Sequence, residues 1–122
     1  KKLKKLIKIS EKKTSKNSFL QINIALNYGS KNELIKAIKL INKNKLKINE
    51  GNIQKNLFTN NIPDPEILIR TGNTKRLSNF LLWQIAYSEI FFEKKFWPDF
   101  NNKDFKKKII KLKKIKRNFG SI

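Results

Sequence analysis

The sequence predicts an α/β fold in which helices flank a mostly parallel sheet. Residues 20–28 alternate between apolar and polar side chains up to Gly29, and this period of two indicates a strand. Residues 31–44 then carry apolar side chains at helical spacing. Residues 66–70 hold a continuous apolar run, which is typical of a strand covered on both faces. Strands and helices in this succession favour an α/β layer architecture.

The first half of the chain predicts two further helices and one cap. Residues 3–13 place their apolar side chains on one helical face. Ser30 and Glu33 have capping-box spacing, in which the hydroxyl and the carboxylate bond the free amides that begin the helix at 31–44. Residues 49–58 predict a shorter helix with three apolar side chains turned inward. These side chains are Ile53, Leu57 and Phe58.

The second half begins with loops around the apolar run. Prolines in residues 60–65 and a glycine in residues 71–75 predict a turn and a loop on either side of it. Ser78 is positioned to cap a helix that runs from Asn79 to about Ile90. That helix is apolar nearly all round, so we expect it to be buried.

The chain closes with a lysine-rich amphipathic helix. Residues 91–96 predict a short strand or an extension of the helix before it, and residues 97–100 predict a turn. The last helix begins near Asn101 or Asn102, and Gly120 suits its end. Its apolar stripe consists of Phe105, Ile109, Leu112, Ile115 and Phe119. No repeat or linker interrupts residues 1–122, so we expect part or all of a single domain.

Composition excludes several classes of chemistry. The chain has neither cysteine nor histidine, so disulfides, thiolate or imidazole metal sites and Ser-His-Asp catalysis are excluded. A general base must be a carboxylate, a lysine, a tyrosine or a group of the substrate. The longest apolar run, residues 80–92, is too short and too polar to span a bilayer. No secretory signal is visible at the start of the sequence.

The net charge of +20 has two interpretations. One is a polyanionic partner, either nucleic acid or an acidic membrane surface. The other is compositional drift, because the abundant lysine, asparagine and isoleucine all have AT-rich codons. The chain also lacks methionine and starts at Lys1, from which we expect that further residues precede it.

A candidate diphosphate site lies between Arg70 and Ser78. Arg70 ends the predicted strand at 66–70, and open α/β sheets place ligands at the carboxyl ends of their strands. The guanidiniums of Arg70 and Arg76 offer bidentate bonds to phosphate oxygens, and Ser78 adds a hydroxyl at a predicted helix start. The alternative is that both arginines are ordinary surface charges. Arginine occurs only at 70, 76 and 117, however, and two in one loop favour function.

Glu89 is the candidate metal ligand. On the predicted helix it shares a face with apolar residues, where a carboxylate is costly unless it is paired or bound to a metal. One interpretation is a ligand for magnesium that bridges substrate phosphates. The other is a carboxylate paired with Arg70 or Arg76, or one that reaches solvent near the helix end.

Four motifs carry a resemblance to a known family. Residues 63–72 read PDPEILIRTG, and residues 76–89 read RLSNFLLWQIAYSE. Residues 97–100 read WPDF, and Asn27-Tyr28-Gly29 precedes Glu33 upstream. In this order they closely resemble the signature of the cis-prenyltransferases, the family of undecaprenyl diphosphate synthases. The resemblance covers residues 14–120 and matches the C-terminal half of that family's single domain.

The resemblance implies both a reaction and its site. The family condenses isopentenyl diphosphate onto an allylic diphosphate such as farnesyl diphosphate, and makes long polyprenyl diphosphates that serve as cell-wall precursor lipids. By resemblance, Arg70, Arg76 and Ser78 would bind isopentenyl diphosphate, and Glu89 would help to bind Mg²⁺. No catalytic residue is expected in this segment. The family further implies a cytoplasmic homodimer, with peripheral membrane contact and no nucleic-acid partner.

The sequence also departs from the family pattern. Asn73 and Thr74 replace the second Gly and the Glu of a family Arg-Thr-Gly-Gly-Glu loop. Lys75 stands where some members have His, and Asn118 replaces an Arg common before Phe-Gly. Asparagine tolerates left-handed backbone, so the change at Asn73 is expected to be mild, whereas loss of the Glu removes a charge.

Two family motifs are missing altogether. An Asp-Gly-Asn motif, whose Asp binds magnesium, and a motif containing Glu-Asn-Trp do not occur in these 122 residues. We therefore expect the 122 residues alone to be inactive and the complete protein to be roughly twice as long. Two alternatives remain at this stage: a non-catalytic subunit of a cis-prenyltransferase pair, and a basic RNA-binding protein.

Overall fold

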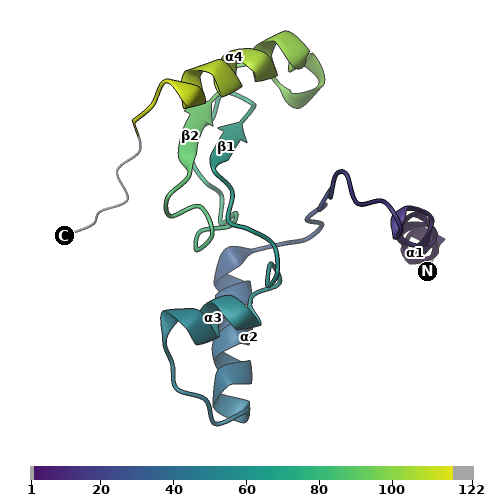
Figure 1. Cartoon of the computed structure of the whole chain (residues 1–122), viewed down its shortest axis with the longest axis vertical. Helices are drawn as coiled ribbons and strands as arrows, with labels where there is room; N and C mark the ends of the chain where they lie inside the picture. Colours follow the sequence, from purple (N-terminus) through teal and green to yellow (C-terminus); the bar gives the residue numbers. More distant parts are fainter. Residues whose placement is uncertain (1, 117–122) are drawn as a thin grey trace.

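The structure is a computed structural model that describes residues 2–116. The chain order is α1 (Lys2–Thr14), α2 (Ser30–Lys43), α3 (Glu50–Asn56), β1 (Ile67–Arg70), β2 (Glu89–Phe92), a 3₁₀ turn (Trp97–Asp99) and α4 (Asn102–Lys113). Figure 1 shows α2 and α3 side by side at one end, the two strands in the middle and α4 across the far end of the strands. Helix α1 stands apart from the rest of the chain.

The two strands form a parallel sheet, as the sequence predicts. Ile67 pairs with Glu89 and Arg70 pairs with Phe92, so both strands end at the same edge. β1 is half-buried along its length rather than fully covered on both faces. Parallel strands need a crossover between them, and residues 71–88 supply it here.

The apolar core is small and sits where α2, α3 and the crossover meet. Its buried apolar side chains, among the described residues, are Ala37, Ile41, Leu57 and Ile85. The prediction that Phe58 points inward is wrong, because its side chain is 61% exposed. Helix α3 ends at Asn56, so Phe58 lies beyond the helical face that covers the core. The ammonium group of Lys36 lies 5.2 Å from the centre of the Phe58 ring.

The predicted capping box at Ser30 is also wrong. Gly29 occupies the N-cap position of α2, and it has no side chain that could cap the helix. Asn79 takes this role from a distant part of the chain: its carbonyl accepts from the Ser30 amide at 2.8 Å and its Oδ1 from the Lys31 amide at 2.9 Å. The start of α2 is therefore fixed by tertiary contacts with the crossover, which short-range spacing cannot reveal.

Residues 20–28 do not form the predicted strand. No backbone amide or carbonyl of residues 19–28 bonds another backbone group within the described residues, and the segment is irregular. A strand is stable only when a neighbouring strand pairs with its polar backbone. The described chain places no strand beside this segment, which explains why the alternating pattern leads to no sheet.

The predicted helix from Asn79 to Ile90 is replaced by successive turns. Ser78, Asn79 and Leu81 have φ angles of 50°, 61° and 45°, which belong to left-handed backbone and stop a right-handed helix. The contacts of Asn79 with α2 and a bond from the Leu82 amide to the Ser30 hydroxyl hold these turns. Tertiary contacts thus override a helical apolar pattern.

Helix α4 confirms the last predicted helix. Asn101 and Asp104 form its capping box, in which each side chain bonds the other's backbone amide. Two ion pairs fasten the helix to the segment after β2: Lys95 to Asp104 and Lys108 to Glu93, each at 2.7 Å. The expected end at Gly120 and the stripe residue Phe119 lie outside the described residues, as do Arg117 and Asn118.

Helix α1 confirms the predicted helix at residues 3–13, but it buries no side chain. Across residues 2–116, no helix is both long and apolar enough to cross a membrane.

Candidate functional site: an anion-binding loop and a buried polar network

Arg70 occupies the carboxyl end of β1, as predicted. Its Nε donates a hydrogen bond to the Thr74 hydroxyl at 3.0 Å. The residue is half-buried, and no carboxylate of the described residues forms an ion pair with it. A guanidinium held by a neutral partner keeps its full charge for an anion, and its remaining N–H groups suit phosphate oxygens.

The loop after Arg70 is fixed to the segment that follows β2. The Gly72 amide donates to the Lys95 carbonyl at 2.8 Å, and the Asn73 amide donates to the Glu93 carbonyl at 3.0 Å. Gly72 has a φ of 89° and Asn73 a φ of 53°. The second angle is left-handed, so asparagine meets the conformational demand for which the family uses glycine, as predicted for this departure.

Thr74, which replaces the family glutamate, has a structural role in the loop. The family glutamate would supply a negative charge here, whereas the Thr74 hydroxyl orients Arg70 without neutralising it. The loop therefore retains a fixed arginine, although it lacks the acidic group.

Arg76 and Ser78 lie further along the same loop and are both exposed. Ser78 does not cap a helix, because residues 78–87 form turns and bends and its own φ is 50°. The contribution of a helix dipole to this site is therefore lost. What remains is two guanidiniums and one hydroxyl on the short segment between residues 70 and 78.

Glu89 lies at the other end of the sheet. It is the first residue of β2 and pairs with Ile67, whereas Arg70 pairs with Phe92. Three residues along a strand correspond to roughly 10 Å, and an odd separation places the two side chains on opposite faces. Within residues 2–116 no ion pair joins Glu89 to either arginine. The paired-carboxylate interpretation is therefore not supported by this arrangement.

A single carboxylate is an incomplete magnesium site. The described residues contain no group of three or more acidic side chains that could hold a metal ion. Mg²⁺ commonly uses one or two carboxylates and completes its shell with water and substrate phosphates. Glu89, which is half-buried and without an ion pair in the described chain, fits one such ligand position and no more.

The sequence did not reveal a buried polar network around Glu33. The carboxylate is 1% exposed and accepts hydrogen bonds from the Tyr28 hydroxyl, from the Phe58 amide at 2.8 Å and from Gln84 Nε2 at 3.2 Å. Gln84 Nε2 also donates to the Thr59 hydroxyl at 2.9 Å. Burial raises the pKa of Tyr28, and its hydrogen bond to Glu33 raises that pKa further. The network joins α2, the segment that follows α3 and the crossover.

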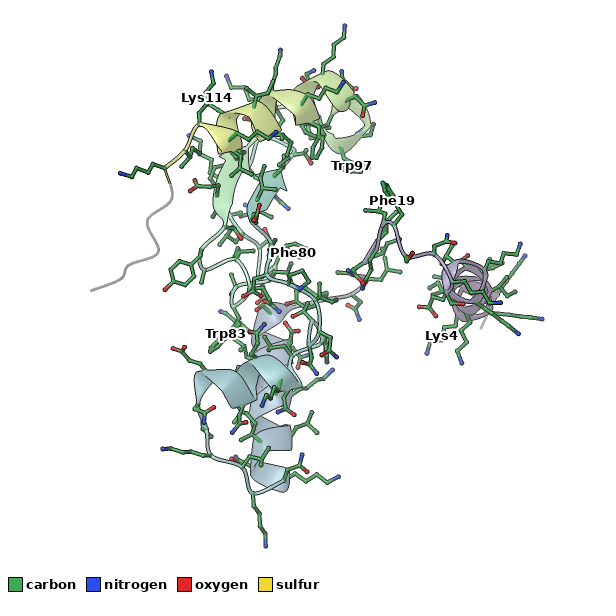
Figure 2. The ribbon with its side chains drawn as sticks, in the orientation of Figure 1. Lys4, Phe19, Phe80, Trp83, Trp97 and Lys114 are labelled. Carbon is green, nitrogen blue, oxygen red and sulfur yellow. The ribbon has the colours of Figure 1, made fainter. Side chains whose placement is uncertain are left out.

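Beside this network is an open cavity of about 440 Å³. Most of its lining is apolar, and residues 23–28 form one wall. Figure 2 shows the labelled Phe80 and Trp83 near the junction of the strands with the helical end, where the crossover side chains gather. The other lining residues are Phe58, Thr59, Ile62, Pro63, Pro65, Phe80, Leu81 and Gln84.

An arginine at the carboxyl end of a parallel strand, followed by a basic loop, is an arrangement typical of α/β proteins that bind ligands at that edge of the sheet. The model of the prenyltransferase family described as undecaprenyl diphosphate synthase matches residues 1–120. The chain belongs to this family.

Individual relatives agree with the family match. The chain is 42% identical to an isoprenyl transferase of Oceanobacillus iheyensis over 95% of its own length and 49% of the relative's. It is 45% identical to a ditrans,polycis-undecaprenyl-diphosphate synthase of Wigglesworthia glossinidia brevipalpis, over 99% of its own length and 49% of the relative's. The chain thus spans about half the length of the curated relatives it matches.

Solved structures agree with the fold as well. A probable undecaprenyl diphosphate synthase from Campylobacter jejuni matches with a TM-score of 0.88 at 38% identity, over 98% of this chain and 57% of that one. Lavandulyl diphosphate synthase from Lavandula x intermedia, in complex with dimethylallyl diphosphate, matches with the same TM-score at 29% identity, over 98% and 54%. The α/β fold with a parallel sheet is confirmed.

Proposed function

We propose that residues 1–122 are the C-terminal portion of a single cis-prenyltransferase domain, and that this portion binds isopentenyl diphosphate. The observation that carries the proposal is Arg70, which is half-buried and held by a neutral hydroxyl at the edge of a parallel sheet. Arg76 and Ser78 complete the clamp on the same loop. The complete enzyme would add isopentenyl units to an allylic diphosphate such as farnesyl diphosphate, and would release a long polyprenyl diphosphate.

The chemistry of this portion is positioning and charge stabilisation. The clamp would hold the diphosphate of isopentenyl diphosphate and so orient its double bond toward the allylic carbon. Bonds between guanidinium and phosphate fix the acceptor while the other substrate loses its diphosphate. Glu89 lies at the other end of the sheet from the clamp; there it would supply one ligand to Mg²⁺, and that ion, when bound, would neutralise phosphate charge. No residue of this segment is assigned as a catalytic acid or base.

The proposed setting is a cytoplasmic homodimer that contacts the membrane surface peripherally. Membrane contact is supported by the exposed lysines on the outward side of α4 and at the residue that follows it, because their ammonium groups could bind acidic lipid headgroups. These cations are Lys103, Lys106, Lys107, Lys111, Lys113 and Lys114. The product would be a precursor lipid for the cell wall, whose apolar chain also favours a place beside the membrane.

The test is a turnover assay on the protein expressed from the longest reading frame that contains this chain. Labelled isopentenyl diphosphate is supplied with farnesyl diphosphate and Mg²⁺, and extracted polyprenyl product is counted. Arg76→Ala should abolish product, and Arg76→Lys should restore little of it, because lysine keeps the charge but not the bidentate geometry. Lys39→Ala, which removes one exposed charge on α2, is the matched control and should leave turnover unchanged.

Two results would overturn the proposal. Equal turnover in the Arg76→Ala and Lys39→Ala proteins would show that Arg76 does not bind the substrate diphosphate as proposed. No product from a folded protein would favour the second candidate, a non-catalytic subunit of a cis-prenyltransferase pair. The observation that favours that candidate is the loop at Asn73-Thr74-Lys75, which lacks the family glutamate. Product from the 122-residue chain alone would contradict the expectation that it is inactive.

A further inference from the structure

Residues 93–95, which follow β2, form a bend around the carboxylate of Glu93. Glu93 Oε1 accepts hydrogen bonds from the amide of Lys94 at 2.8 Å and from the amide of Lys95 at 3.3 Å. Because one charged oxygen bonds two successive amides, it fixes the path of the chain as it leaves β2. We call residues 93–95 the β2 bend.

One side of the β2 bend is bonded to the anion-binding loop, residues 70–78, through backbone groups. The Glu93 amide donates to the Arg70 carbonyl at 2.7 Å. The Asn73 amide donates to the Glu93 carbonyl at 3.0 Å. The Gly72 amide donates to the Lys95 carbonyl at 2.8 Å. The path of the loop between its two arginines therefore depends on the position of the bend.

The other side of the β2 bend is held to α4 by two ion pairs. Glu93 Oε2 pairs with the Lys108 ammonium, and the Lys95 ammonium pairs with Asp104, each at 2.7 Å. The side chains of Glu93 and Lys108 are only 16% and 20% exposed, so solvent screens this pair less than an ordinary surface pair. The hydrogen bond from Lys108 lowers the pKa of Glu93, and the bond from the Lys95 amide lowers it further, so the carboxylate is charged at neutral pH.

We propose that the β2 bend and its two ion pairs position the diphosphate clamp, which makes Glu93 and Lys108 positioning residues for isopentenyl diphosphate. Glu93 is the centre of this linkage, because its backbone bonds the loop, one carboxylate oxygen bonds the bend and the other pairs with α4. Helix α4 is then the support against which the loop is fixed. Bonds between guanidinium and phosphate are directional, so a small displacement of the loop weakens them. The inference rests on the proposed clamp and adds the residues that hold it in place.

The charge of Glu93 separates positioning from simple electrostatic attraction. Glu93 is an anion close to a loop that would bind an anion, so attraction alone predicts that its removal strengthens diphosphate binding. Positioning predicts that its removal weakens binding. Glu93→Gln suits this test, because the glutamine oxygen can still accept from the amides of the bend, whereas the ion pair with Lys108 is lost.

The experiment measures binding of isopentenyl diphosphate by calorimetry, in the protein expressed from the longest reading frame that contains this chain. Glu93→Gln and Lys108→Gln should each weaken binding about threefold, which is within the range expected for one lost ion pair. The double variant should bind no more weakly than either single variant, because both changes break the same pair. Lys108→Arg keeps the pair and should bind as tightly as the unaltered protein.

Lys94 supplies the matched control. It belongs to the same bend, is exposed and forms no ion pair within residues 2–116. Lys94→Gln removes the same charge as Lys108→Gln without breaking a contact with α4. It should therefore leave the affinity for isopentenyl diphosphate unchanged.

Hydrogen–deuterium exchange tests the linkage without substrate. In the unliganded Glu93→Gln and Lys108→Gln proteins, the amides of Gly72 and Asn73 should exchange about threefold faster, because their acceptors belong to the β2 bend. The Phe58 amide, which donates to the buried Glu33 carboxylate, should exchange at an unchanged rate and so report that the rest of the fold is intact.

Unchanged or stronger binding in the Glu93→Gln protein would overturn the proposal and leave only electrostatic attraction. Equal weakening by Lys94→Gln and Lys108→Gln would overturn it as well. So would equally accelerated exchange of the loop amides and the Phe58 amide, which would indicate a general loss of stability.

Arg76→Ala, measured in the same way, separates this proposal from the clamp. If Arg76→Ala weakens binding and Glu93→Gln does not, the clamp stands and the positioning role is refuted. Full affinity in the Arg76→Ala protein would refute the clamp itself, and the positioning role with it.

Discussion

The polar network around Glu33 should be the most sensitive point of this small fold. Glu33→Ala removes a carboxylate that is 1% exposed and accepts from three donors. Gln84 Nε2 keeps its bond to Thr59, and the half-buried Tyr28 hydroxyl can turn toward water, but the Phe58 amide loses its acceptor. A stranded buried donor costs about 1–3 kcal/mol, and the emptied volume adds to this.

The expected loss is therefore about 2–4 kcal/mol in the free energy of unfolding, reduced somewhat because a buried charge is also removed. Urea denaturation followed by Trp83 fluorescence measures it, since the Trp83 indole bonds Gln54 of α3 beside the network. Glu11→Ala, on the exposed helix α1, removes the same group without a buried partner and should change the free energy by no more than about 0.5 kcal/mol.

Glu33→Gln sharpens the test. The glutamine can still accept from the Phe58 amide, and Gln84 can turn its own amide so that its oxygen faces the new donor. The expected loss is only about 1 kcal/mol, close to one ordinary hydrogen bond. If Glu33→Ala cost no more than Glu11→Ala, or if Glu33→Gln cost as much as Glu33→Ala, the network would not hold the fold as argued.

Three further predictions concern other parts of the molecule. Gly29→Ala would place a Cβ 2.8 Å from Asn79 Nδ2, so the cap of α2 must shift; thermal denaturation should show a loss of about 1–2 kcal/mol, and an unchanged midpoint would contradict the contact. Thr74→Val removes the hydroxyl that orients Arg70, and calorimetry should find isopentenyl diphosphate bound about fivefold more weakly, as expected for one lost hydrogen bond. Unchanged affinity would show that binding does not require this hydrogen bond to Arg70. The Lys95 ammonium holds the pKa of Asp104 below its ordinary value, so the stabilisation that this pair gives α4 is present above the unfolded-state pKa of Asp104. That stabilisation is lost as the pH falls through the folded-state pKa. Asp104→Asn should therefore flatten the acid side of the profile of melting temperature against pH, and an unaltered profile would exclude this pair as a cause.

The sequence by itself determined the elements whose stability is local. Helix α2 follows from its apolar spacing, α4 from its spacing together with the asparagine cap at its start, and β1 from a short apolar run between turns. The motif around Arg70 and Arg76 identified the family, which the comparisons confirmed. Asn73 was recognised as a residue that tolerates left-handed backbone, and the structure finds it there.

Tertiary structure alone decided the elements that depend on distant partners. Residues 20–28 alternate like a strand but remain unpaired, because pairing requires a neighbour that local sequence cannot provide. Residues after Ser78 carry a helical pattern, yet Asn79 turns left-handed and caps α2 from a distant part of the chain. The register of β1 and β2 put Glu89 at the opposite end of the sheet from Arg70, because that separation depends on how the strands pair and not on their spacing in the chain.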